Sequence, residues 1–546
     1  MNNHKKMDVS TWLPLRYPFF KMLWIAAVFS NIGSWMHEVG AAWLMTSLTN
    51  KPLLIALVQS ASTLPIFLLA LPAGALADVL DKRHFLIVLQ ACMAITAGVL
   101  AVAVFYNHIT PLSLLLFTLT LGSFNALDAP GWQAIVPELV TAEAMPPAIA
   151  LMGGAINISR AFGPALAGFI ITLSGPAAVF AFNSISFLGV IIVFWLWRHE
   201  KVTSTLPAER LMGAMRAGFR YVRSSPALHN VLVRTFTFFI FVSASWALLP
   251  LVVRKKLGLG AGSYGALLSL LGVGAILAAV WLPKLHKRYN PDQLTNKGTL
   301  VFSLSILLLA LSNNFYLICG GMLLGGVAWM VVLATLNTAA QFAVASWVRA
   351  RALAIYLVAF FGGLSLGSIL WGAVATHLSL ATTLLIAGIG MICSNILSRF
   401  FTLEKSLKLD HTPTGHMPAP KVVGPIESDQ GPVMITVEYE VSPSQQKDFV
   451  EVMQNARRIR LREGAFFWNL FNNIDDPNCF IECYIVESWL EHLRQHERIS
   501  VSDRKVQDRA DSFHRGSKPP LISHFVAYNY SRNEKTTPEE PLNCPY

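Results

Sequence analysis

Long apolar runs separated by short polar segments dominate the chain up to about position 400. An uncharged helical run of about twenty residues can cross a bilayer core about 30 Å thick. Six such runs precede a polar segment at 198–228 and six follow it, beginning near Met22, Leu53, Phe85, Leu112, Ala148, Val179, Val231, Tyr264, Gly298, Tyr316, Leu353 and Thr382. The pattern therefore predicts an all-α membrane bundle, 1–405, with two six-helix halves at 1–197 and 229–405 joined by the loop 198–228.

A different pattern follows the last apolar run. Residues 406–431 are rich in proline and glycine, which is typical of a linker. Residues 432–530 alternate between period-two and helical patterns in the order strand, helix, strand, strand, helix, strand. This order predicts a small cytoplasmic ferredoxin-like α+β domain, followed by a disordered tail at 531–546. Such a sheet leaves one face uncovered, so self-association through this domain is one hypothesis about partners.

Composition and charge support a membrane protein. Only 13% of the residues are charged and 54% are hydrophobic, so the chain lacks the polar surface that a water-soluble protein of this length needs. The net charge of +11 comes from short clusters between apolar runs and not from one basic stripe, which argues against nucleic-acid binding. Most of these clusters fall on one side of the predicted membrane, which favours both termini in the cytoplasm of a bacterial inner membrane. The rule leaves one cluster on the other side unexplained, at Arg254, Lys255 and Lys256.

The turn after the second run has the sequence GALADVLDKR at positions 74–83. It resembles the signature loop of the major facilitator superfamily, matching at Gly74, Leu76, Asp78, Lys82 and Arg83 and departing at Val79 and Asp81. The resemblance implies that Asp78 caps a helix of the other half near Arg351, and that the basic residues latch the outward-open state. A carboxylate at a helix N-terminus is stabilised by the free N–H groups there. The alternative interpretation is an ordinary positively charged turn.

The fifth run contains AINISRAFGPALAGFI at 155–170. Its Gly163, Pro164 and Gly168 resemble the glycine-proline element of exporters in the same superfamily, and the resemblance implies export. The alternative is close packing, because small residues let membrane helices approach one another.

Charged residues within apolar runs are candidates for function, since a charge in the bilayer is costly unless it is paired or wet. Arg160 is such a residue, and we expect it to face a cavity. Its candidate partners are Glu38 in the first run and Asp128 near the end of the fourth, and either carboxyl group could bind a proton in competition with substrate. His37, next to Glu38, is a candidate relay. The alternatives are a structural pair or an interfacial position for Glu38, and a helix end for Asp128.

The predicted tail domain offers little chemistry. His492 and His496 lie four residues apart on one helix, but the third ligand and the protease signature of a zinc site are missing, so we expect no metal. The domain resembles antibiotic-biosynthesis-monooxygenase-like proteins without an evident catalytic motif. We therefore expect a binding or dimerisation module and not an enzyme, with no cofactor. Nucleotide-binding signatures are also missing.

Together, the signature loop, the fifth-run element and the tail resemble the transmembrane secretion effector branch of the major facilitator superfamily, which includes enterobactin exporters. The resemblance implies a secondary active antiporter that exports a small organic molecule, siderophore-like or drug-like, in exchange for protons by alternating access. One alternative is an uptake permease. Another places a monooxygenase-like or sensor activity in the tail, with the bundle as an anchor.

Overall fold

A computed structural model describes residues 12–79, 81–197, 220–403, 426–427 and 430–527, and most of the predicted loop 198–228, most of the linker and the tail after 527 lie outside these ranges. Within these described ranges, twelve helices are long and apolar enough to cross a membrane, as the sequence predicted. They are α1 (Pro18–Leu48), α2 (Pro52–Val79), α3 (Lys82–Phe105), α4 (Pro111–Leu139), α5 (Met145–Ser174), α6 (Pro176–Leu196), α8 (Pro226–Leu251), α9 (Ala261–Arg288), α10 (Pro291–Leu311), α11 (Phe315–Phe342), α12 (Arg349–His377) and α13 (Leu380–Leu397).

Proline sets the start of half of these helices. Six of them begin on a proline, at positions 18, 52, 111, 176, 226 and 291. The fixed φ of proline and its missing N–H suit the first helical turn, where the N–H would have no partner in the helix. The helices therefore start a few residues before the apolar runs that predicted them, and α8 begins inside the stretch 198–228 that was assigned to the loop.

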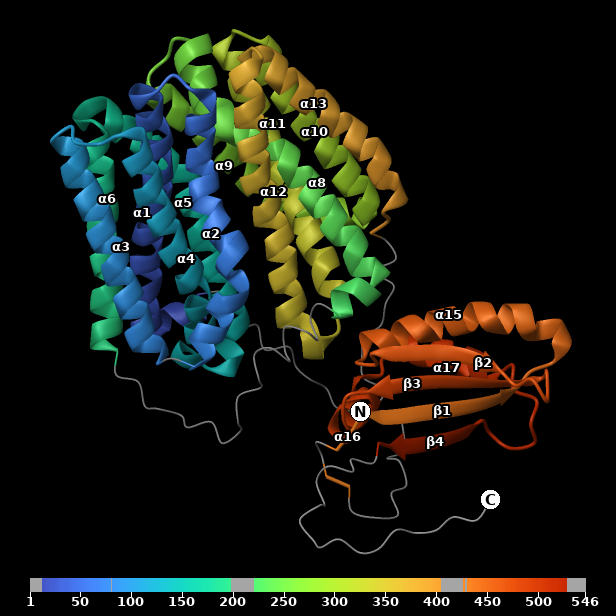
Figure 1. The fold of residues 1–546 in the computed structure, drawn as a ribbon. Helices are drawn as coiled ribbons and strands as arrows, with labels where there is room; N and C mark the ends of the chain where they lie inside the picture. Colours follow the sequence, from blue (N-terminus) through green and yellow to red (C-terminus); the bar gives the residue numbers. More distant parts are fainter. Residues whose placement is uncertain (1–11, 80, 198–219, 404–425, 428–429, 528–546) are drawn as a thin grey trace, which may run out of the picture. The chain divides into compact units, whose positions relative to one another are not determined.

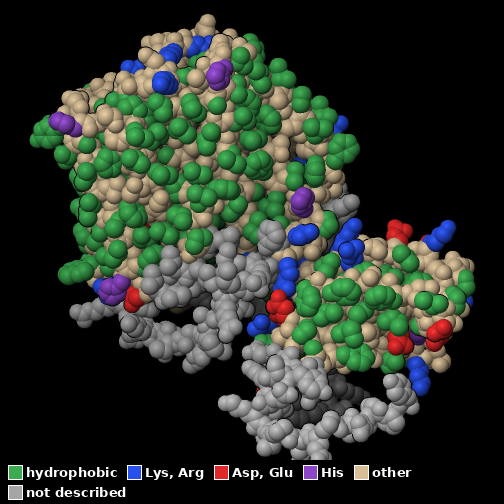
Figure 2. Space-filling model, in the orientation of Figure 1, with side chains coloured by type: hydrophobic (Ala, Val, Ile, Leu, Met, Phe, Trp, Pro, Cys, Tyr) green, Lys and Arg blue, Asp and Glu red, His purple; other side chains and the backbone are tan. Residues whose placement is uncertain are grey.

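The helices form two groups, α1–α6 and α8–α13, which we call the first and second halves (Figure 1). The connections α1 to α2, α5 to α6, α8 to α9 and α12 to α13 lie at one end of the bundle, which we call the distal end. The opposite end, where α6 ends and α8 begins, is called the central-loop end. Hydrophobic side chains cover much of the face of the bundle that Figure 2 shows, and residues such as Phe105, Trp195 and Leu173 are mostly exposed. Lipid is the solvent that such a surface requires.

The second compact unit consists of Gly213–Pro226, Val344–Arg349 and Lys408–Tyr546. Within it, the Tyr221 hydroxyl accepts a hydrogen bond from Ala345 N at 3.1 Å, and the Tyr221 ring meets Trp347 edge to face. The Arg498 guanidinium lies 4.0 Å from the centre of the Trp347 ring. Two short segments from between membrane helices therefore belong to the same compact unit as the tail domain.

The tail domain contains a four-stranded antiparallel sheet with the order β2-β3-β1-β4. Its elements are β1 (Val433–Glu440), α15 (Gln446–Arg462), β2 (Phe467–Asn472), β3 (Cys479–Val486), α16 (Trp489–Arg498), α17 (Val501–Asp511) and β4 (Leu521–Val526) (Figure 1). Phe449 of α15 and Ala510 of α17 pack on Tyr439 and Phe480 of the sheet. This arrangement is consistent with the predicted small α+β domain.

The second helical region of the tail is divided into two helices. Ser500 accepts a hydrogen bond from Asp503 N, and the Asp503 side chain accepts one from Ser500 N, which forms a capping box at the start of α17. Because a capping box satisfies free N–H groups at a helix start, it favours a new helix here over a continuation of α16.

Candidate functional site

The site is assembled from α1 and α5 of the first half and α8 and α9 of the second. Gly163 and Gly168 explain how closely these helices approach. A Cβ atom at Gly163 would lie 2.6 Å from Cβ of Trp35 on α1, and one at Gly168 would lie 2.8 Å from the carbonyl oxygen of Ala261 on α9. Pro164 lies between them and its carbonyl is covered by Gly265 of α9. The small-residue face of α5 therefore packs on both halves at once.

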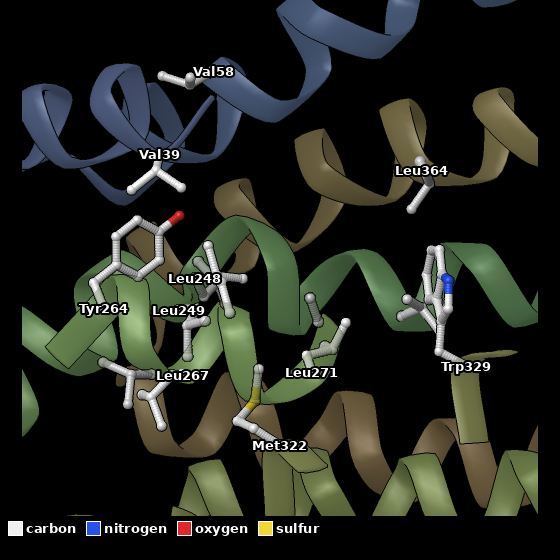
Figure 3. Close-up of a cluster of buried hydrophobic side chains, with 14 of the residues drawn as sticks. Val39, Val58, Leu248, Leu249, Tyr264, Leu267, Leu271, Met322, Trp329 and Leu364 are labelled. Carbon is white, nitrogen blue, oxygen red and sulfur yellow. The ribbon is translucent and has the colours of Figure 1, made fainter. Parts of the chain in front are cut away.

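A small, partly enclosed pocket lies between the two halves near this packing. Its lining includes Trp35 and Glu38 of α1, Gln59 and Ser62 of α2, Trp246 of α8 and Tyr264 of α9, and its volume is about 20 Å³. A space of that size holds about one water molecule. Figure 3 shows Val39 and Val58 of the first half facing Tyr264 and Leu248 of the second half within the hydrophobic cluster beside this pocket. Glu38 is the carboxyl group of the pocket.

Arg160 lies next to this pocket. Its guanidinium carbon is 5.5 Å from the centre of the Trp35 ring, and its Nε is buried without a hydrogen-bond partner. Glu38 and Arg160 attract one another electrostatically, but the described residues contain no direct ion pair between them. A cation on an aromatic face is stabilised without being neutralised. The structure thus brings Arg160 and Glu38 into electrostatic interaction, beside a space that holds about one water molecule.

The other two candidates in the first half face elsewhere. The ring of His37 meets Phe180 of α6 at 5.0 Å, and both its nitrogens are buried without partners. Asp128 of α4 is buried and accepts a hydrogen bond from Gln90 of α3 at 3.0 Å. Neither residue lines the pocket of Glu38 as it is described. Their roles in proton transfer stay predictions.

The basic residues of the signature loop interact within the first half. Lys82 Nζ lies 2.8 Å from a carboxylate oxygen of Glu138 on α4, and Arg83 donates hydrogen bonds of 2.7 Å to the carbonyls of Phe194 and Trp195 at the end of α6. Cations are favourable at a helix C-terminus, where free carbonyls carry partial negative charge. Gly74 and Asp78 belong to the last turns of α2, where side chains lie outside the described part, so the cap by Asp78 stays a prediction.

Sequence reasoning missed a buried charge in the second half. Arg234 of α8 is 3% exposed and forms an ion pair of 2.5 Å with Asp292 of α10, and it also donates to Asn296 and to Ser398. Asp292 in turn accepts from the backbone N–H of Leu403. A lone arginine in the run VLVRTFTFF was the available signal, because a charge in a span needs a partner.

The tail domain has a polar core of its own. Glu482 is fully buried and accepts hydrogen bonds from Arg460 and from Trp468 Nε1. His492 and His496 contact each other through their Nε2 atoms at 3.2 Å, and burial lowers the pKa of His492 to about 3 and also lowers the pKa of His496. Across the described ranges, no group of three or more His, Cys, Asp or Glu side chains is arranged to hold a metal ion.

Comparisons with known proteins agree with the twelve-helix membrane bundle as the core of a transporter. The family model described as transmembrane secretion effector matches residues 9–532. The staphyloferrin A transporter of Staphylococcus aureus (strain NCTC 8325 / PS 47) is 25% identical over 388 residues, covering 70% of this chain and 96% of that protein. An uncharacterized MFS-type transporter of Bacillus subtilis (strain 168), YfiS, is 22% identical over 307 residues, covering 55% of this chain and 70% of that one.

Solved structures show the same fold. A point mutant of the nucleoside transporter NupG superimposes with a TM-score of 0.59 at 15% identity, covering 70% of this chain and 99% of its own. A bacterial homologue of the human lysosomal transporter Spinster, in an inward-facing and unoccupied conformation, gives a TM-score of 0.56 at 12% identity over 71% and 98% of the two chains. Because the family model spans nearly the whole sequence, the chain belongs to the transmembrane secretion effector family of major facilitator transporters.

Proposed function

We propose that this multi-pass transporter exports a small organic molecule, siderophore-like or drug-like, from the cytoplasm in exchange for protons. The central observation is the position of Glu38. Its carboxyl group lies in a small, partly enclosed pocket between the two halves, and the nearby Arg160 has a buried Nε without a hydrogen-bond partner among the described residues. Alternating access requires the halves to separate on one side at a time, which would wet this pocket in one state and close it in the other.

A carboxyl group in such a pocket can couple cargo binding to proton binding. A carboxyl group that is alternately enclosed and hydrated holds its proton differently in the two states. A hydrogen-bond donor or cationic group of the cargo would bind the ionised carboxylate of Glu38, next to Arg160, and would compete with a proton for it. Cargo binding would then favour a deprotonated Glu38, and protonation of Glu38 would favour cargo release, which is the exchange that an antiporter needs.

Two further observations support the cargo class and the direction. The staphyloferrin A transporter is named for its cargo, and it matches most of this chain and nearly all of its own length. Gly163, Pro164 and Gly168, which resemble the exporter element, pack α5 against α1 of the first half and α9 of the second half. The distribution of Lys and Arg along the sequence supports both termini in the cytoplasm of a bacterial inner membrane.

Cargo and energy source can be tested together. A deletion strain and its complemented parent are compared by mass spectrometry of cell extracts and culture supernatants, with and without a protonophore. Ethidium accumulation serves as a drug-like probe in the same cells. Export predicts that at least one compound is retained in the deletion strain and that the protonophore produces the same retention in the parent. Depletion of a medium component only by the complemented strain would show uptake instead.

The role of Glu38 is tested by Glu38→Gln. This substitution keeps the shape of the side chain and removes its titration, so we expect proton-driven efflux to fall to the level of the deletion strain. Glu143→Gln is the matched control, because Glu143 is an exposed carboxylate between α4 and α5. Unchanged protonophore-sensitive efflux by Glu38→Gln would remove Glu38 from the coupling mechanism.

We further propose that the tail domain self-associates through the sheet face opposite its helices. Cross-strand pairing places Phe467, Ile485, Met434 and Phe525 in one row on the same face. Phe467 is 39% exposed and Phe525 is 50% exposed. A patch of exposed aromatic residues on a sheet is typical of an interaction surface. Phe525→Asp should lower the molar mass of the full chain in detergent from dimer to monomer by light scattering, whereas a wild-type chain that is already monomeric would contradict the proposal.

A further inference from the structure

Three consecutive cations occupy the distal end of the bundle, where basic residues are scarce in the sequence. Arg254, Lys255 and Lys256 form the end of a π-helical turn, η3 (Val252–Lys256), which continues α8. Its widened hydrogen bonds include Leu257 N to the carbonyl of Val252 at 3.0 Å. Single π-turns within helices are often found at functional sites.

Two of these cations reach across to the first half. Arg254 donates a hydrogen bond of 2.9 Å to the hydroxyl of Thr46, and Lys255 donates one of 3.1 Å to the carbonyl of Asn50. Thr46 lies in the last turn of α1, and Asn50 lies two residues after its end. The Arg254 guanidinium also lies 5.6 Å from the centre of the Trp43 ring. Both contacts therefore join the second half to the distal end of α1.

The third cation turns back to its own half. Lys256 Nζ donates hydrogen bonds of 2.9 Å and 2.7 Å to the carbonyls of Leu309 and Ala310 in the last turn of α10. It thus anchors η3 to the second half, while its two neighbours contact the first. One short turn holds both halves, and each contact is made to a helix end that favours positive charge.

We infer that Arg254 and Lys255 form a reversible latch that closes the distal side of the transport pathway. Their partners on α1 are a hydroxyl and a carbonyl, which are neutral groups. Arg254 and Lys255 are themselves exposed to solvent. Separation of the halves would therefore return both cations to water and leave no buried charge without a partner, unlike the opening of a buried ion pair. Such contacts hold one state without making the other inaccessible.

The latch lies directly outside the Glu38 pocket. Trp43, which Arg254 covers, stacks on Tyr264 with 6.0 Å between ring centres, and Tyr264 lines the pocket. When Arg254 and Lys255 release α1, this ring pair loses its cover and the pocket gains a route to the distal side. The latch thus controls when Glu38 meets the distal solution.

Hydrogen–deuterium exchange of the full chain in nanodiscs tests the latch without knowledge of the cargo. In the double variant Arg254→Gln and Lys255→Gln, exchange in the peptide 43–52 should rise about two- to fivefold, because exposed polar contacts of this kind are individually weak. Exchange at 306–312, the end of α10, should stay at the wild-type level. Lys256→Gln is the matched control and should show the reverse pattern.

Thr46→Ala provides an independent variant, because it removes the acceptor on α1 and leaves all three cations in place. It should raise exchange at 43–52 in the same direction as the double variant. The inference is overturned if both the double variant and Thr46→Ala leave the peptide 43–52 unchanged. It is also overturned if Lys256→Gln raises exchange there as much as the double variant does, since the three cations would then act as one general cap.

Discussion

Glu482 in the tail domain and Glu38 in the membrane bundle are both carboxyl groups near an arginine, but they are partnered differently. Glu482 accepts hydrogen bonds from two nitrogens of Arg460 and from the Trp468 indole, at 2.9 to 3.3 Å. Glu38 has no hydrogen bond within the described residues, and the nearby Arg160 keeps a buried Nε without a partner. Glu482 holds one domain together, whereas Glu38 lies between two halves that must move apart.

In this chain, the number of hydrogen-bond and ion-pair partners of a buried charged group separates structural charges from functional ones. Arg234 in the second half is closer to the tail pattern, because its terminal nitrogens bind Asp292, Asn296 and Ser398, although its buried Nε has no hydrogen-bond partner among the described residues. Buried charges with several bonded partners are costly to break. An underpartnered charge costs little to rearrange, and it can accept a new partner such as a proton or a ligand group.

The largest expected effect is in the tail. Glu482→Ala leaves Arg460 and the Trp468 indole buried without their acceptor, and breaking a buried pair in this way costs about 3–5 kcal/mol of unfolding free energy. Hydrogen exchange of the full chain in a denaturant series should show loss of protection over 433–526. Arg458→Ala, an exposed position on α15, is the control and should change stability by less than about 0.5 kcal/mol. Equal effects of the two variants would contradict the structural role of Glu482.

Glu463 is an intermediate case between Glu482 and Glu38, because it is a carboxylate of the tail domain with one buried oxygen that lacks a hydrogen-bond partner among the described residues. Burial raises the pKa of Glu463 from 4.5 to about 7, although Arg462 opposes this shift at 2.9 Å. A raised pKa in the folded state means that its stabilising contribution is complete below pH 4.5 and is lost as the pH rises through 7. Between pH 4.5 and about 7, Glu463→Gln should therefore make the unfolding free energy of the tail domain depend less on pH. Hydrogen exchange of the full chain in a denaturant series at several pH values measures this. The exposed Glu451→Gln should leave the slope unchanged.

In the membrane bundle, loss of an underpartnered charge should reduce transport and leave stability nearly unchanged. Arg160→Ala removes a cation without stranding a bonded partner, so we expect the thermal unfolding midpoint to stay near that of the wild type. Efflux should fall at least about tenfold, which corresponds to about 1.4 kcal/mol of lost stabilisation. Protonophore-sensitive efflux in cells, normalised to protein in the membrane, measures this loss. A large fall in the midpoint with normal efflux per molecule would place Arg160 with the structural charges.

The sequence predicted the elements of the fold better than the pairing of its charges. The twelve spans follow from apolar runs whose length is set by the bilayer, and the tail strands follow from period-two alternation. Arg160 and Glu38 were predicted as partners because each was a lone charge in a span. Arg234 carried the same signal, but its partner Asp292 opens a different helix, and only tertiary packing brings them together. The cations at 254–256 could not be interpreted because Lys255 and Lys256 bond to main-chain carbonyls, which no sequence pattern marks.

Asp128→Asn should have the smallest effect, and it tests whether burial alone makes a carboxyl group functional. Asp128 is as well enclosed as any candidate, but it lies between α3 and α4 within one half, where Gln90 already donates to it. Asparagine keeps an acceptor oxygen for Gln90, so stability should change by less than about 1 kcal/mol and proton-driven efflux should remain. If Asp128→Asn abolished efflux while Glu38→Gln did not, the proton site would lie inside the first half and not between the halves. The partner count would then fail as a guide, because a hydrogen-bonded carboxyl group would be the one that exchanges protons.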